Sequence, residues 1–246
     1  MQNDTVIPVF TDNKSAENTD KMNGGDDNEQ GTIDFYYFPP SPPCRSVMML
    51  AKTLGLDMNM KSVNVMAGEQ MTPEYLEMNP QHSIPTLDDK GFVLWESRAI
   101  LQYLADRYAK DDTLNPKEAK RAALVNQRLY FDACTLYPRL YEYFYPVIFR
   151  QQQPNQEKAE KVEEALELLN GFLENQIWVA GSYMTVADFA LAATVSTAQL
   201  MQFDLSKYPN VESWYKRAKK TMSDFEEINE QGAEMMGNMF KKNTEQ

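Results

Sequence analysis

The chain has 246 residues, of which 43% are hydrophobic and 24% are charged. This length and composition allow one or two globular domains with a buried core, so disorder throughout is excluded. The 24 basic and 36 acidic residues give a net charge of −12. Nucleic acids and anionic lipids both bind basic patches, which a negative net charge disfavours. A transmembrane helix needs about 18 consecutive apolar residues, and this sequence has no such run. We therefore expect neither a nucleic-acid partner nor a membrane partner.

Histidine and cysteine are scarce. The sequence has one histidine, His82, and two cysteines, Cys44 and Cys134. They are too few for a zinc cluster or a framework of disulfide bonds. We therefore expect a metal-free protein of a reducing compartment, the cytoplasm.

Residues 1–31 differ in composition from the rest of the chain. They contain seven acidic residues and two lysines among many Asn, Gly and Thr. Such a segment buries too little apolar surface to order itself, and it lacks the marks of a secretory or mitochondrial signal. We expect a disordered acidic tail that acts as a passive extension, and a regulatory role stays open.

Strand and helix signals alternate in the next part of the chain. Residues 33–37 are β-formers that two prolines stop, and Ser41 followed by Pro42 is typical of the start of a helix, which Gly55 ends. Further elements are expected as strands at 60–65, 84–87 and 91–94 and a helix at 97–108. This order predicts a small α/β domain over residues 32–109.

Helical periodicity dominates the rest. Residues 110–116 are polar and predict a linker. After it, apolar residues recur every three or four positions in three stretches, at 122–144, 162–173 and 211–222. We expect an all-α domain over 117–236, in which Pro138 kinks the first long helix, and a disordered tail over 237–246.

A capping box is the most specific local signal in the second half. In Thr185-Val186-Ala187-Asp188 the hydroxyl and the carboxylate are spaced to accept hydrogen bonds from each other's backbone N–H. The motif predicts a helix start and serves folding only.

Five segments carry motifs at characteristic spacing. They are IDFYYFPPSPPCRSV (33–47), NPQHSIPTL (79–87), LWESRAILQYL (94–104), LYFDACTLYPRLYEYFYP (129–146) and TVADFALAATVST (185–197). Together they resemble the arthropod delta class of cytosolic glutathione S-transferases. The resemblance implies an α+β fold, in which a thioredoxin-like βαβαββα domain holds glutathione and an all-α helical bundle domain supplies the electrophile pocket and much of a homodimer interface.

Glutathione reacts as its thiolate, and a free thiol with a pKa of about 8.5 is mostly protonated at neutral pH. A hydroxyl at a helix N-terminus can stabilise that anion by about 1.5–3 kcal/mol, which lowers the thiol pKa by about one to two units. Ser41 stands at such a predicted helix N-terminus, and by resemblance it is the catalytic serine. The alternative is that Ser41 serves only as the N-cap of the helix. Tyr36 and Tyr37 are competing hydroxyls, but their strand position favours packing.

Glutathione-binding residues follow from the resemblance. Ile84 precedes a predicted cis Pro85 and binds the peptide through its backbone, while His82 contacts the glycyl carboxylate or is a structural loop residue. Three residues at the start of a helix, where free N–H groups favour an anion, surround the γ-glutamyl end: Glu96, Ser97 and Arg98. Arg98 orients that end or forms a structural ion pair.

Aromatic residues gather at the end of the long helix. By resemblance, Tyr137, Tyr145 and Phe149 line the hydrophobic substrate pocket; the alternative is packing within the bundle or against a second subunit. Arg128 and Asp132, four positions apart, match family positions near the cleft or form a helix-surface pair.

Some positions depart from the family pattern. Pro40 stands where delta enzymes commonly have Gly, and Gln70 stands where they often have His, so glutathione affinity and activity are in question. Cys44 takes the second place of a thioredoxin CxxC whose first cysteine is Ser41, and we expect it to be buried and unreactive. Cys134 is expected to pack.

The sequence thus predicts a transferase that conjugates glutathione to hydrophobic electrophiles. Two other functions stay open. A non-catalytic member that binds glutathione or hydrophobic ligands is favoured by Pro40 and Gln70, and a glutathione-dependent peroxidase is favoured by Cys44 alone.

Overall fold

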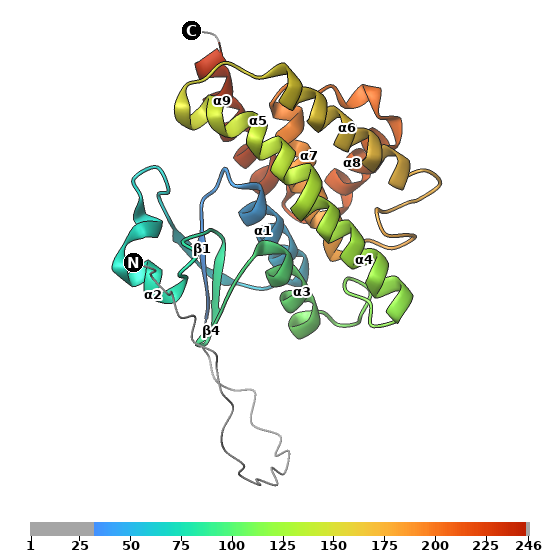
Figure 1. The fold of residues 1–246 in the computed structure, drawn as a ribbon. Helices are drawn as coiled ribbons and strands as arrows, with labels where there is room; N and C mark the ends of the chain where they lie inside the picture. Colours follow the sequence, from blue (N-terminus) through green and yellow to red (C-terminus); the bar gives the residue numbers. More distant parts are fainter. Residues whose placement is uncertain (1–31, 245–246) are drawn as a thin grey trace, which may run out of the picture. The chain divides into compact units, whose positions relative to one another are not determined.

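The computed structural model describes residues 32–244 (Figure 1). The tail predicted for 1–31 lies outside the described residues, as do 245 and 246. The first half contains β1 (Ile33–Tyr37), α1 (Pro42–Leu54), β2 (Met58–Ser62), η1 (Glu69–Met71), α2 (Pro73–Met78), β3 (Thr86–Asp89), β4 (Phe92–Trp95) and α3 (Ser97–Tyr108). The second half contains α4 (Ala119–Phe131), η2 (Asp132–Leu136), α5 (Tyr137–Arg150), α6 (Gln156–Phe172), α7 (Val186–Leu200), η3 (Leu205–Lys207), α8 (Pro209–Thr221), η4 (Phe225–Glu230) and α9 (Gln231–Thr244).

The sheet has the strand order β2-β1-β3-β4. β1 runs parallel to β2 and antiparallel to β3, and β3 and β4 form a hairpin. Because side chains alternate along β1, Phe35 is buried on one face, while Tyr36 meets Tyr75 of α2 edge-on. α1 and α3 lie on one side of the strands and α2 on the other (Figure 1). Both tyrosines considered as rival hydroxyls pack here, since Tyr37 stacks on Phe35.

Helix α1 begins and ends where the sequence predicts. Ser41 is its N-cap with extended backbone, and Pro42 and Pro43 occupy the first helical positions. At the other end Gly55 adopts the left-handed conformation at φ 71°, and its N–H bonds to the Lys52 carbonyl at 3.0 Å. The chain therefore places the Ser41 hydroxyl at the mouth of this helix.

Five short elements differ from the prediction made from residue patterns. β2 covers 58–62, two residues earlier than expected, and the hairpin strands are likewise shifted by one or two residues. The polar stretch before the hairpin contains η1 and α2. Residue patterns did not predict either of them, but the βαβαββα order implied by the resemblance includes α2. Thr72 caps α2 by accepting a hydrogen bond from the Tyr75 N–H, and Pro73 follows it. This start signal was present in the sequence.

The long helix of the second half is broken by a π-helical segment, η2, directly before Pro138. Proline has no N–H, so the regular hydrogen-bond ladder cannot continue past it, and the chain takes one wider turn. The structure places Pro138, where a kink was predicted, in the first turn of α5, just after the π-helical segment. The prediction that Cys134 packs is wrong. The wider turn rotates Cys134 outward, and it is exposed.

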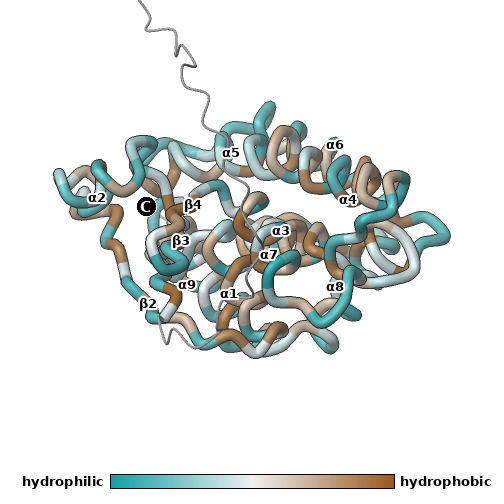
Figure 2. The backbone as a smooth tube through the Cα atoms, turned by 90° about the horizontal axis from the view of Figure 1, so that it is seen from below, coloured by the Kyte–Doolittle hydropathy of each residue, from teal (hydrophilic) through white to brown (hydrophobic). Residues whose placement is uncertain are grey.

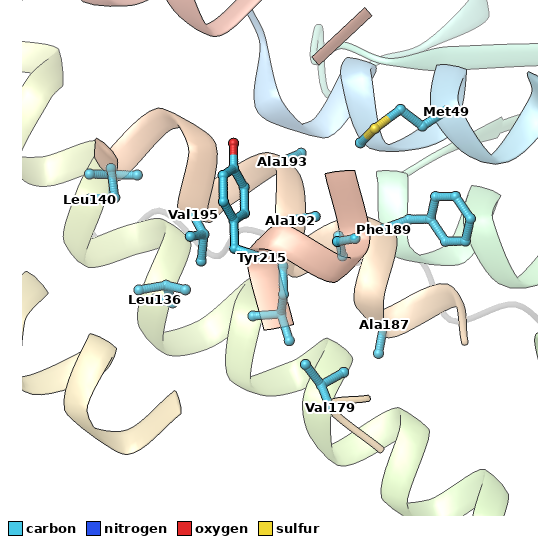
Figure 3. Close-up of a cluster of buried hydrophobic side chains, with 14 of the residues drawn as sticks. Met49, Leu136, Leu140, Val179, Ala187, Phe189, Ala192, Ala193, Val195 and Tyr215 are labelled. Carbon is cyan, nitrogen blue, oxygen red and sulfur yellow. The ribbon is translucent and has the colours of Figure 1, made fainter. Parts of the chain in front are cut away.

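Helix α7 lies in the middle of the core. It is apolar on all sides and buried along most of its length, with α1, α3, α4 and α9 packed against it. Figure 2 shows α1 and α7 side by side among the other helices. Core side chains shared by the two halves appear in Figure 3, where Met49 of α1 lies close to Phe189 of α7. Within residues 32–244, no helix combines the length and apolar character needed to cross a bilayer.

The start of α7 is the predicted capping box. The Thr185 N–H donates to the Asp188 carboxylate at 2.8 Å. This carboxylate is fully buried and also accepts from the Val179 N–H at 3.0 Å and from the Trp214 indole N–H at 2.9 Å. The box thus ties α7 to the preceding turn and to α8, which the sequence motif does not reveal.

The end of the chain is helical where a tail was expected. α9 continues to Thr244, so the prediction of disorder is wrong for residues 237–244. Met236 and Phe240, four positions apart, are buried and hold the helix against the bundle. The Asn243 amide donates to the Val147 and Ile148 carbonyls of α5 at 2.9 and 3.1 Å.

Candidate active site

A cavity of about 410 Å³ lies between the start of α1, the loop before β3 and the aromatic face of α5. It brings together six residues predicted from the sequence: Ser41, His82, Ile84, Tyr137, Tyr145 and Phe149. The remaining lining residues were not predicted as site residues: Phe38, Pro42, Val65, Gln70, Tyr141, Phe144 and Met236.

Ser41 is 8% exposed at this cavity. Its backbone is fixed, because its N–H donates to the Phe38 carbonyl at 2.9 Å and its carbonyl accepts from the Arg45 N–H at 3.0 Å. The hydroxyl caps no backbone N–H of α1. Pro42 and Pro43 at the first helical positions have no N–H to offer it. The Ser41 side chain therefore caps no backbone group of the helix.

Cys44 lies in the first turn of α1, after Ser41, and is fully buried. Burial raises the pKa of its thiol to about 11, although hydrogen bonds with Ser41 and with the Phe38 N–H act in the opposite direction. The thiol is thus protonated at neutral pH, as expected for a buried and unreactive cysteine.

We expect a thiol reagent at neutral pH to label Cys134 and to leave Cys44 unlabelled in the folded protein. The reagent can reach Cys134, which is exposed, but not Cys44, which is buried. The raised pKa of Cys44 also keeps its thiol in the unreactive protonated form. Mass spectrometry after labelling checks this. Cys134→Ser should abolish labelling of folded protein and leave one reactive thiol in urea; rapid labelling of folded Cys134→Ser protein would contradict the assignment.

The loop before β3 presents Ile84 and His82 to the cavity. The Ile84–Pro85 bond is cis, as predicted. The Tyr75 hydroxyl and the Asn79 amide both donate to the Ser83 carbonyl, at 2.8 and 3.0 Å, and so hold the loop. His82 is exposed and sits in a left-handed turn at φ 45°.

The three residues at the start of α3 do not line the cavity. Glu96 is exposed and has a left-handed backbone at φ 69°. Ser97 is buried and accepts a hydrogen bond from the Arg98 guanidinium at 3.0 Å. Arg98 forms a partly buried ion pair with Asp132, with a distance of 2.9 Å from Nε to Oδ2, and lies over the Tyr137 ring. This ion pair is one of the two roles predicted for Arg98.

Arg128 and Asp132 do not pair, so the prediction of a helix-surface pair is wrong. Both are buried and have other partners. Arg128 donates to the Val179 carbonyl at 2.8 Å and stacks over Phe172. Asp132 accepts from the Thr194 hydroxyl at 2.7 Å in addition to Arg98. The burial of α4 and η2 against α7 directs these side chains inward.

One face of α5 forms an aromatic wall. Tyr137, Tyr141, Tyr145 and Phe149 are spaced four apart, so their rings follow one another along the helix. The Tyr141 and Tyr145 ring centres are 4.8 Å apart, and those of Tyr145 and Phe149 are 4.7 Å apart. Burial raises the pKa of Tyr137 and brings that of Tyr141 to about 12. Both hydroxyls therefore stay protonated at neutral pH and can donate hydrogen bonds.

Two further lining residues lie where residue patterns predicted no individual helix: Gln70 in the polar stretch before the hairpin and Met236 at the end of the predicted all-α domain. Gln70 belongs to η1, and its Oε1 atom is buried without a hydrogen-bond partner among the described residues. Met236 comes from α9. The sequence signalled Gln70 only through its match to a family position, and Met236 only through its i, i+4 spacing to Phe240.

Gly232 of α9 permits a close approach to the loop before α1. A Cβ atom at this position would lie 2.7 Å from the Pro39 carbonyl oxygen and would overlap the Arg45 side chain. We expect Gly232→Ala to cost about 1–3 kcal/mol of unfolding free energy and to lower glutathione-dependent turnover, because the Ser41 loop must shift. Gly171→Ala in α6 is the control, since nothing lies within 4 Å of its Cβ. Equal behaviour of the two variants in denaturant unfolding and turnover assays would contradict the packing argument.

Comparison with known proteins identifies the family. The model of the glutathione S-transferase N-terminal domain matches residues 31–106, and that of the C-terminal domain matches 136–219. Glutathione S-transferase D7 of Anopheles gambiae is 47% identical over 86% of this chain and 98% of its own length.

Solved structures agree. A delta-class glutathione transferase of Nilaparvata lugens is 48% identical, with a TM-score of 0.83 over 86% of this chain and 100% of that one. A glutathione transferase homologue with bound glutathione, from Drosophila mojavensis, is 32% identical, with a TM-score of 0.82 over 86% and 97%. The order of strands and helices, the shared cavity and these matches together assign the chain to the glutathione S-transferase family, as a delta-class transferase that uses glutathione as its co-substrate.

Proposed function

We propose that this protein conjugates glutathione to hydrophobic electrophiles, and that the Ser41 hydroxyl stabilises the reacting thiolate. The observation that carries the proposal is that this hydroxyl, with no capping role in α1, shares one cavity with the aromatic wall of α5. One hydrogen bond to a charged sulfur contributes about 1.5–3 kcal/mol, so a separate general base is not required.

Glutathione would lie along the first-half side of the cavity. The Ile84 backbone would pair with the peptide backbone as one strand edge pairs with another, and His82 would contact the glycyl carboxylate. The start of α3, with Glu96 and Ser97, would bind the γ-glutamyl end. Arg98, which its ion pair with Asp132 holds in place, would orient the γ-glutamyl end. The unpartnered Oε1 of Gln70 offers a neutral contact in place of a charge.

The electrophile would lie against the aromatic wall. Tyr137, Tyr145 and Phe149 supply flat apolar surface, and Met236 supplies a pliable one. The hydroxyl groups of Tyr137 and Tyr145 would steady a leaving group or a polarised carbonyl. The reaction is then addition or substitution by the thiolate at an apolar electrophile.

We further propose that the protein acts as a homodimer in the cytoplasm. Light scattering of the purified protein tests the dimer.

The direct test is the ultraviolet absorbance of the thiolate of bound glutathione, measured against pH. We expect a thiol pKa well below that of free glutathione in the native protein, and an increase of about one to two units in Ser41→Ala. Ser46→Ala is the matched control, because its hydroxyl already donates to the Pro43 carbonyl at 2.8 Å inside α1.

A bound thiol that is still protonated at neutral pH, or a pKa that Ser41→Ala leaves unchanged, would reject the serine mechanism. Glutathione binding without turnover would instead identify a non-catalytic member of the family.

A further inference from the structure

Arg45 is a fully buried cation on α1, one helical turn beyond Ser41. All its hydrogen-bond partners are neutral. Nη1 donates to the Ser196 hydroxyl and to the Asn229 carbonyl, both at 2.9 Å, and also to the Asn229 side-chain oxygen. Nη2 donates to the Ala193 carbonyl at 3.3 Å and to the Thr197 hydroxyl. The guanidinium thus joins α1 to α7 and η4.

No carboxylate partners this guanidinium anywhere in residues 32–244. Glu230, which directly follows Asn229 in η4, is instead bound to Lys219 at 2.7 Å. The titratable groups that interact with Arg45 are the thiol of Cys44 and the phenols of Tyr137 and Tyr215, all with raised pKa values and neutral at physiological pH. Burial lowers the pKa of Arg45 to about 10, so the side chain keeps its positive charge. A buried charge without a counterion is unusual, because a carboxylate normally offsets the desolvation cost.

The position of this charge connects it to the cavity. The Arg45 N–H donates to the Ser41 carbonyl at 3.0 Å, and about 6 Å of helix axis separates the two residues. Cys44 contacts Ser41, and Tyr137 lines the cavity; both feel the Arg45 charge. The guanidinium is therefore buried near the start of α1, where the glutathione thiolate would bind. Water screens a charge little in such an interior.

We propose that Arg45 is a positioning residue that also acts at a distance, its uncancelled positive charge stabilising the thiolate of glutathione bound at Ser41. This inference rests on the proposed function. A unit charge about 10 Å away at an effective dielectric constant of about 20 shifts a pKa by about one unit. Neutral acceptors are essential to the effect, because a carboxylate at the same place would anchor α1 equally well and cancel the field.

Asn229→Asp separates anchoring from charge. The Asn229 Nδ2 atom is buried and has no hydrogen-bond partner in the described part of the chain, so its replacement by oxygen sacrifices no hydrogen bond there. The Arg45 Nε atom is also unpartnered and can donate to the new carboxylate. We expect the variant to fold with unchanged or higher stability, while the pKa of bound glutathione rises by about one unit and turnover near neutral pH falls several-fold.

Controls isolate the electrostatic effect, with thiolate absorbance against pH as the readout. Asn170→Asp adds the same charge in α6, where Asn170 accepts a hydrogen bond from the Asn210 N–H, and should leave the thiol pKa unchanged. Arg45→Lys keeps the charge and should keep the thiol pKa within about half a unit despite lower stability. Arg128→Met removes another buried arginine held by neutral acceptors and should lower stability without shifting the thiol pKa.

The outcomes distinguish this inference from the function on which it rests. A thiol pKa raised in Asn229→Asp and retained in Arg45→Lys supports a charge effect. A pKa raised by Ser41→Ala but unchanged in Asn229→Asp overturns the role of Arg45 and leaves the serine mechanism intact. A native protein whose bound glutathione is not ionised near neutral pH rejects the proposed function itself.

Discussion

Replacing Asp188 with alanine is expected to lower the free energy of unfolding by about 3–5 kcal/mol, the largest stability effect of any substitution considered for this protein. The carboxylate is fully buried and accepts from two backbone N–H groups, the Thr185 hydroxyl and the Trp214 indole. Its removal leaves all of these donors buried without a partner. Because α7 forms the centre of the core, loss of its N-terminal anchor should affect the whole fold. Urea unfolding measures the change.

Asp57→Ala is the matched control for this substitution, since Asp57 is exposed and should change stability by no more than about 0.5 kcal/mol. The pH dependence gives a second readout. Burial raises the pKa of Asp188 from 3.8 to about 6, so between these values the folded state binds a proton that the unfolded state has lost. The contribution of this group to stability therefore falls as pH rises from about 4 to about 6. Asp188→Asn should lose this slope; equal stability of Asp188→Ala and Asp57→Ala would contradict the argument.

Replacing Ser41 with alanine is expected to lower kcat/KM for conjugation by about 10- to 150-fold near neutral pH. The loss corresponds to one hydrogen bond to the thiolate, because the hydroxyl serves no capping role in α1. The KM for glutathione should change less, since the remaining contacts are proposed to come from residues such as Ile84 and His82. Steady-state kinetics with a general aromatic electrophile check this.

The pH profile separates this effect from simple distortion of the site. As pH rises above the pKa of the bound thiol in Ser41→Ala, glutathione ionises without help, so the activities of variant and native protein should converge. Ser41→Thr, which keeps a hydroxyl, should retain part of the activity. A constant ratio of activities from neutral to alkaline pH would show that the hydroxyl acts in some other way.

Local signals account for the elements that the sequence predicted correctly. Proline at the start and glycine after the end delimit α1, and the Thr185–Asp188 spacing marks the start of α7. α2 was not read from residue patterns although its Thr72–Pro73 start signal lies in the sequence, whereas α9 depends on tertiary contacts. α9 contains Gly232 and Gly237, which disfavour an isolated helix, yet both allow close approach to neighbouring segments. Its stability comes from packing, which no local pattern reveals.

The candidate site was predictable to the extent that family motifs cover it. Ser41, Ile84 and the α5 aromatics lie in such motifs, and they meet in one cavity. The hydrogen-bond and ion-pair partners of the buried charged side chains were not predictable. Arg128 and Asp132 stand at ideal helical spacing, but burial gives each a partner from elsewhere in the chain. The neutral environment of Arg45 could not be anticipated either, because Asn229 lies 184 positions away in the chain.

The last helix supplies one side of the cavity through Met236 and is fastened to α5 by Asn243. A change of the α9 side chain that faces the cavity, Met236, would therefore alter the cavity's apolar lining. We expect such a change to alter the proposed electrophile pocket and to leave the proposed glutathione subsite, which is built from the first half of the chain, unchanged.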